Sequence, residues 1–150
     1  MTSTDPLLQP TLQQTSRGAA PWRLSSQGYV AFFGGALAGT AVAVANAVRL
    51  GLPRRTVLVI SAIGAAALAL TIVLMLVVGD RAGNAGLGLL RLVPVAAYLV
   101  QARLQRDRNR AFALQGGKHA RLLGPGIAAV LVLGLLELVA IDAVLEAVDR

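Results

Sequence analysis

The sequence predicts an all-α membrane protein, a small bundle of about four transmembrane helices (residues 28–150) behind a disordered N-terminal tail (residues 1–27). Four apolar stretches carry the prediction, at about residues 29–48, 56–78, 84–102 and 124–147. Each is about as long as a helix rising about 1.5 Å per residue needs to cross a hydrocarbon core of about 30 Å. None alternates like a barrel strand, and in lipid each segment must satisfy its own backbone.

Composition supports this class and excludes others. Hydrophobic residues make up 56% of the chain and the mean hydropathy is +0.69, which leaves too few polar residues to cover a water-soluble globule. The net charge is +7, but the apolar stretches leave no soluble basic domain, so we expect no nucleic-acid partner. The chain has no Cys and a single His, His119, so we expect neither a metal site nor a cofactor.

The first stretch contains a candidate packing face. Gly35 and Gly39 form a small-xxx-small pair, and Asn46 follows Gly35 by close to three helical turns, on the same face. Small residues let another backbone come close. The favoured interpretation is a contact with a helix of the same molecule, and the alternative is a contact with a partner membrane protein or a second copy.

The second and third stretches differ in how clearly they cross. The second has no charge over 56–78 and is followed by a turn rich in Gly and Asn at 79–86. In the third, the favourable insertion free energy of eight Leu or Val between residues 86 and 100 is about equal to the cost of inserting one arginine, Arg91. Pro94 would also kink the helix. We therefore favour four spans and keep three as the alternative.

An intramembrane charge pair is the most specific site predicted. The fourth stretch carries Glu137 near its middle, and an antiparallel hairpin of the third and fourth spans would place Arg91 and Glu137 at similar depth. A carboxylate partner would offset the desolvation of the arginine. In the alternative, Arg91 reaches the outer headgroups and Glu137 carries a proton.

The segment 103–121, which we predict to be partly helical, is the strongest charge feature. Lys and Arg are most abundant on its side of the membrane with either number of spans, which predicts that it is cytoplasmic and that the C-terminus lies outside. The N-terminal tail would lie outside with four spans and inside with three. Besides anchoring the topology, the basic side chains are candidates to contact anionic lipid headgroups or a partner protein; they are Arg103, Arg106, Arg110, Lys118 and Arg121.

Two sequence motifs resemble a family. The run FFGGALAGTAVAVANAVRLGLPRR, with QGGK at 115–118, resembles a widespread group of small uncharacterised bacterial multi-pass membrane proteins whose first span reads F-[LF]-G-G-x-L-A-G. The matching residues are Phe33, Gly34, Gly35, Leu37, Ala38 and Gly39, then Asn46, Arg49, Leu50 and Gly51; Ala36 replaces the Pro found in that group. The resemblance implies multi-pass helices in a bacterial cytoplasmic (inner) membrane and carries no activity.

Three functional classes follow from these features. The favoured one is a non-catalytic packing, scaffold or accessory subunit, suggested by the Gly35 and Gly39 face and the basic segment. The alternative is a small transporter or transporter subunit that uses Arg91 and Glu137, since ionisable groups at membrane depth are costly and often functional. An enzyme is the least favoured class, because the chain lacks the clustered acidic, His or Cys residues that membrane enzymes use.

Overall fold

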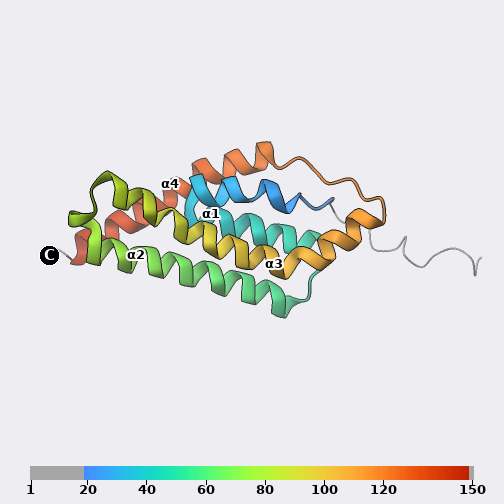
Figure 1. The fold of residues 1–150 in the computed structure, drawn as a ribbon, viewed down its shortest axis with the longest axis horizontal. Coiled ribbons are helices and arrows are strands. Elements are labelled where there is room, and N and C mark those ends of the chain that lie inside the picture. Colours follow the sequence, from blue (N-terminus) through green and yellow to red (C-terminus); the bar gives the residue numbers. More distant parts are fainter. Residues whose placement is uncertain (1–18, 149–150) are drawn as a thin grey trace, which may run out of the picture.

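The chain folds into helices, in agreement with the predicted class. In the computed structural model, residues 19–148 are described, except for the side chains at 78–87 and 89. The elements within this range are a short 3-10 helix and four α-helices: η3 (Leu24–Ser26), α1 (Gly28–Arg49), α2 (Arg54–Leu90), α3 (Leu92–Leu114) and α4 (Leu123–Val148) (Figure 1). No strand is present in the described range.

Three segments are long and apolar enough to cross a membrane: Gly28–Arg49, Arg54–Val77 and Leu123–Val148. Their large aliphatic side chains are widely exposed; on α4, Leu131, Val132 and Leu135 are each more than 60% exposed. Such a surface is unfavourable in water and suited to lipid. The multi-pass membrane character predicted from the sequence is therefore supported by the fold.

The helix α1 does not run straight, although the sequence predicted a single crossing here. Its backbone leaves helical geometry at Gly35 (φ 78°, ψ −163°), and the chain then returns towards its starting end (Figure 1). The backbone N–H of Trp22 donates to Oδ1 of Asn46 over 2.7 Å, although the two residues are 24 positions apart. A straight helix would separate them by about 36 Å. The first apolar stretch is therefore a helical hairpin.

Side-chain packing between the two legs confirms the reversal. A Cβ placed on Gly39 would lie 2.9 Å from the Cβ of Ala31, whereas residues eight apart in one helix lie about 12 Å apart along its axis. Near the chain's entry, the Arg49 guanidinium lies 3.7 Å from the centroid of the Trp22 ring and donates to the Ala20 carbonyl over 3.1 Å. We call the Gly35 reversal the tip of the hairpin and the end holding Trp22 and Arg49 the base.

The start of the chain is more ordered than predicted. Residues 1–18 lie outside the described range, but the rest of the predicted tail, 19–27, is built into the base. Trp22 is only 5% exposed and belongs to an apolar core with Val30, Val42 and Leu122. Residues 1–27 are rich in proline and polar residues and contain no apolar run, so their composition predicted disorder. One buried aromatic ring, that of Trp22, is enough to order residues 19–27.

The other helices surround the hairpin. The α1 hairpin packs against α2, α3 and α4, and α3 returns beside α2 (Figure 1). The turn predicted at 79–86 falls inside the helical bounds of α2. The sequence predicted a kink at Pro94 within a third span. Pro94 instead lies in the first turn of α3, where its missing N–H removes no helical hydrogen bond.

The base also receives the connection between α3 and α4. As predicted for part of 103–121, α3 is helical to Leu114, and Gly116 follows with φ 78°. The N–H of Ala120 then donates to the Pro21 carbonyl over 3.0 Å, which joins this connection to the chain's entry. From there α4 runs to the opposite end of the bundle (Figure 1). The described N-terminal residues and the end of α4 therefore lie at opposite ends.

Candidate functional site

The break in α1 creates a set of backbone groups that lack helical partners. Gly35 has a positive φ and an extended ψ, a combination that essentially only glycine adopts. Each leg therefore has its own helix end: the carbonyls before the break and the N–H groups after it cannot bond along a continuous helix. Gly35 and Ala36 are buried, so backbone groups there need partners within the protein.

The N–H groups after the break are satisfied by Glu137 of α4. The N–H of Ala36 donates to Oε1 over 3.1 Å and that of Leu37 donates to Oε2 over 2.6 Å. Both carboxylate oxygens thus sit at the N-terminus of the second leg, where exposed N–H groups and the helix dipole favour negative charge. Glu137 is only 5% exposed, so this capping occurs inside the protein.

A carbonyl before the break is satisfied by Arg91, which precedes α3. Its Nη1 donates to the carbonyl oxygen of Phe33 over 3.3 Å. A cation is electrostatically favourable at a helix C-terminus for the same reason that an anion is favourable at an N-terminus. One charged side chain from α4 and one from the turn between α2 and α3 therefore hold the two sides of one break.

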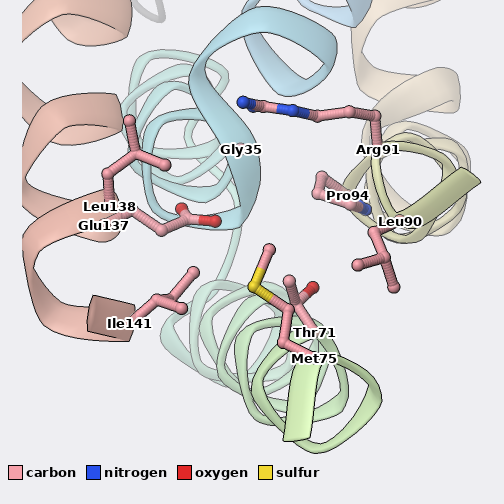
Figure 2. A pocket seen from close by; sticks show the side chains of 9 residues that line it. All are labelled: Gly35, Thr71, Met75, Leu90, Arg91, Pro94, Glu137, Leu138 and Ile141. Carbon is pink, nitrogen blue, oxygen red and sulfur yellow. The ribbon is translucent and has the colours of Figure 1, made fainter. Parts of the chain in front are cut away.

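A small cavity of about 40 Å³ adjoins this arrangement. Figure 2 shows that Glu137 reaches it from α4, Thr71 and Met75 from α2, and Arg91 from the opposite side, with Gly35 above. The volume suffices for about one water molecule. Because Thr71 donates its hydroxyl hydrogen to the Ala67 carbonyl over 2.9 Å, its oxygen keeps acceptor capacity.

The two residues of the predicted charge pair do meet at one site, but by another arrangement. Both line the cavity, and each bonds a different backbone segment of α1. A direct ion pair between these two described side chains is not among their contacts. The prediction that the two residues lie near each other did not include the third participant, the hairpin tip, because the tip lies inside an apparently continuous apolar stretch.

The predicted packing residues Gly35, Gly39 and Asn46 do not share one helix face. Gly35 meets the Glu137 carboxylate and Gly39 meets Ala31 of the same hairpin, so the two glycines do not form one helical face. Asn46 is fully buried at the base, where its Nδ2 donates to Oε1 of Gln105 over 2.9 Å. All three residues pack within the molecule.

Two buried glutamines on α3 were missed by the sequence argument. Gln101 donates through Nε2 to the Ile60 carbonyl (3.0 Å) and to Oγ1 of Thr40 (3.2 Å), and Gln105 accepts from Asn46. Their spacing of four residues was a signal for a polar face on α3. The arginines interleaved with them drew attention to the opposite, exposed face, which holds Arg103, Arg106 and Arg110.

The arrangement brings one acidic and one basic side chain to the two sides of a helix break. Within the described part of the chain, no group of three or more acidic, His or Cys residues is placed to hold a metal ion. Comparison with protein-family models, with curated proteins and with solved structures found no match to this chain. The geometry at the hairpin tip is therefore the most specific functional feature of the described chain.

Proposed function

We propose that the chain is a small membrane transporter, or a subunit of one, in which the hairpin tip binds and releases a proton at Glu137. A single observation carries the proposal: a helix broken at Gly35 has its two sides held by Glu137 and Arg91. Broken helices recur at the transport sites of membrane carriers, where the freed helix ends face the substrate or the coupling ion. Irregular backbone at membrane depth otherwise needs burial or a wet cavity.

The chemistry of the cap suggests how such a site would switch. The ionised carboxylate of Glu137 binds the two N–H groups of Ala36 and Leu37 with both oxygens. A proton added to one oxygen weakens its acceptor strength and removes the attraction to the helix dipole. In this proposal the tip then loosens, and Arg91 is left as the uncompensated charge beside the cavity. A proton or a small anion is the cargo class that fits.

Orientation is part of the same proposal. Arg49 lies at the base, and the start of α2, which carries Arg54 and Arg55, and the basic segment 103–121 lie at the same end of the bundle (Figure 1). The positive-inside rule would place this end in the cytoplasm. We propose that α2, α3 and α4 cross and that α1 enters and leaves on the cytoplasmic side, with the C-terminus outside. The family resemblance supports a bacterial inner membrane. In this arrangement the N-terminal tail lies inside and the third stretch crosses the membrane. The four-span prediction placed the tail outside, because there the first stretch crosses as well.

Cysteine labelling tests the orientation, because the chain has no native Cys. Single-Cys variants at Ser25, Gln115 and Ala147 are labelled in intact cells and in inverted membrane vesicles with a membrane-impermeant maleimide. We expect Ser25 and Gln115 to react only in inverted vesicles, and Ala147 only in intact cells. Labelling of Ser25 and Gln115 from opposite sides would contradict the hairpin topology.

A flux measurement tests the transport proposal. Purified protein is reconstituted with an internal pH-sensitive dye, and a proton gradient is imposed with chloride or with a large impermeant anion. We expect wild-type protein to dissipate the gradient faster than protein-free vesicles, and Glu137→Gln to lose this activity. Asp142→Asn, an exposed carboxylate on the same helix, is the matched control and should retain it. Wild-type flux equal to that of protein-free vesicles for both anions contradicts transport of these cargoes.

An accessory or scaffold subunit is the second candidate. Two observations favour it: both sides of the break are already bonded within the chain, and α4 exposes a broad apolar surface while packing mainly against α1. In this case Glu137→Gln lowers thermal stability, flux is absent throughout, and crosslinking in native membranes captures a partner along α4 or along the exposed Arg103, Arg106 and Arg110. The two candidates thus differ in the wild-type flux.

A further inference from the structure

The cavity at the hairpin tip has the size of a single water molecule. Its volume is about 40 Å³, whereas pockets that hold small-molecule ligands measure about 300–1,000 Å³. Glu137 reaches it from α4 and Thr71 from α2, and Arg91 lies on the opposite side (Figure 2). The other described lining residues have no side-chain hydrogen-bond donor; they are Gly35, Met75, Leu90, Pro94, Leu138 and Ile141.

Two buried hydrogen-bond acceptors line this cavity. Thr71 and Glu137 are each only 5% exposed. The Thr71 hydroxyl donates its hydrogen to the Ala67 carbonyl over 2.9 Å, so its oxygen can only accept a further bond. The ionised carboxylate of Glu137 accepts one backbone N–H at each oxygen, and each oxygen has a second lone pair. A molecule that joins Thr71 to Glu137 must therefore donate a hydrogen bond to each of them.

A water molecule has the donors that this pair requires. Its two O–H groups can donate to Thr71 and Glu137. Its oxygen can accept from the Arg91 guanidinium, which uses Nη1 for the Phe33 carbonyl and has further N–H groups. A buried water typically makes about three hydrogen bonds, and these three side chains supply that many partners. A small anion such as chloride accepts hydrogen bonds and donates none, so the two acceptors disfavour it.

We infer that Thr71 positions one water molecule beside Glu137, and that this water transfers a proton to the carboxylate. The inference rests on the proposed function and narrows its cargo to the proton. A hydronium ion from the solvent gives one proton to the water, and the water gives one of its own to Glu137. At each transfer one O–H bond breaks and another forms, so the products are two water molecules and a neutral carboxyl group. Thr71 is a positioning residue, because its own hydroxyl hydrogen stays on the Ala67 carbonyl.

Substitutions at Thr71 test this role in the flux assay, with potassium and valinomycin present to prevent a membrane potential. Thr71→Val keeps the shape of the side chain and removes the acceptor. Proton flux should then fall about tenfold or more, the factor that corresponds to one lost hydrogen bond. Thr71→Ser keeps the acceptor and should retain flux. The matched control is Ser61→Ala, because Ser61 makes the same bond to a carbonyl four residues earlier on α2 and does not line the cavity.

The outcomes of this assay separate the inference from the proposed function. Full flux in Thr71→Val beside an active wild type overturns the positioned water and leaves the transport proposal in place. Dissipation of the gradient with chloride, but not with the impermeant anion, identifies the anion as cargo and also overturns the inference. Thermal unfolding should give Thr71→Val and Ser61→Ala the same stability within error, so that a loss of flux in Thr71→Val is not a loss of fold.

Infrared spectroscopy of the protein in detergent tests the water without transport. The carboxyl bands of Glu137, ionised or protonated, are identified by their loss in Glu137→Gln. A hydrogen bond from water changes the frequency of these bands, so Thr71→Val should shift them, whereas Thr71→Ser and Ser61→Ala should not. Unshifted bands in Thr71→Val contradict the water bridge whether or not the protein transports protons. Shifted bands without wild-type flux support the bound water and contradict both the proton transfer and the proposed function.

Discussion

The two ends of the α1 hairpin are held by different chemistry. At the tip, the charged side chains of Glu137 and Arg91 bond directly to backbone groups freed by the break. At the base, neutral amides join the two legs and α3: Asn46 accepts from the backbone of Trp22 and donates to Gln105. Two charged side chains therefore bond the backbone groups freed by the break at the tip, whereas at the base buried amides do most of the bonding, together with Arg49 on the Ala20 carbonyl.

This difference follows from the hydrogen-bonding requirements of each end. Hydrogen bonds to charged groups are about twice as strong as neutral ones, and the tip must compensate buried backbone groups that the break leaves without helical partners. At the base the α1 backbone is bonded within its own helix, so the amides mainly join separate segments. Changes at the tip should thus cost more stability than changes at the base.

The largest loss is expected for Glu137→Leu. It removes both acceptors of the Ala36 and Leu37 N–H groups and leaves them buried without partners, at a cost of about 3 kcal/mol or more. Unfolding in detergent micelles, followed by circular dichroism against added denaturing detergent, measures it. The matched control is Asp142→Leu, which makes the same kind of change at an exposed position of α4. Equal effects of the two changes would show that the cap contributes little.

Gly35→Ala should be the next most damaging change. The φ of 78° at Gly35 is strained for any other residue by about 1–3 kcal/mol, and an added Cβ would lie within 2.7 Å of the Glu137 carboxylate. Gly124→Ala is the control, because nothing lies within 4 Å of a Cβ at that position. In the same unfolding assay, Gly35→Ala should be far less stable than Gly124→Ala. If Gly35→Ala were tolerated, the break could not have the geometry described here.

At the base, two buried glutamines should respond in opposite directions. Gln105→Leu leaves Nδ2 of Asn46 without its acceptor and should cost about 1–3 kcal/mol. Gln27 is equally buried, but neither polar atom of its amide has a partner, so Gln27→Leu should be neutral or stabilise by up to about 1 kcal/mol. Thermal unfolding of the two variants side by side measures the difference. A loss with Gln27→Leu as large as that with Gln105→Leu would indicate an internal partner for Gln27.

The smallest effect is expected from the pH dependence at His119. Because its pKa is lowered on folding, the folded protein binds the proton less well than the unfolded chain. The contribution to stability is therefore complete above the ordinary value of 6.5 and is lost as the pH falls through the lowered pKa. Stability of wild-type protein should decline more than that of His119→Gln over this interval. Parallel pH profiles would show that His119 does not contribute.

Within α1 and α4, similar sequences have different paths. Both are apolar and contain internal glycines, yet α4 stays helical through Gly134 while α1 reverses at Gly35. Glycine permits a break, but a break at membrane depth also needs partners for the freed backbone groups. Those partners, Glu137 and Arg91, come from segments about a hundred and about sixty residues away along the chain. A local pattern in the first stretch could not contain them.

The sequence by itself determined the all-helical class with membrane-spanning character, the bounds of α4 and the helical start of the basic segment. These features depend on local hydropathy, helix rise and charge position, which act within one segment. Only the tertiary structure decided that the first stretch is a hairpin, that residues 19–27 are anchored and that Gln101 and Gln105 are buried. Each of these depends on long-range contacts that supply hydrogen-bond partners, and the pattern of a single segment does not specify which distant residues those partners are.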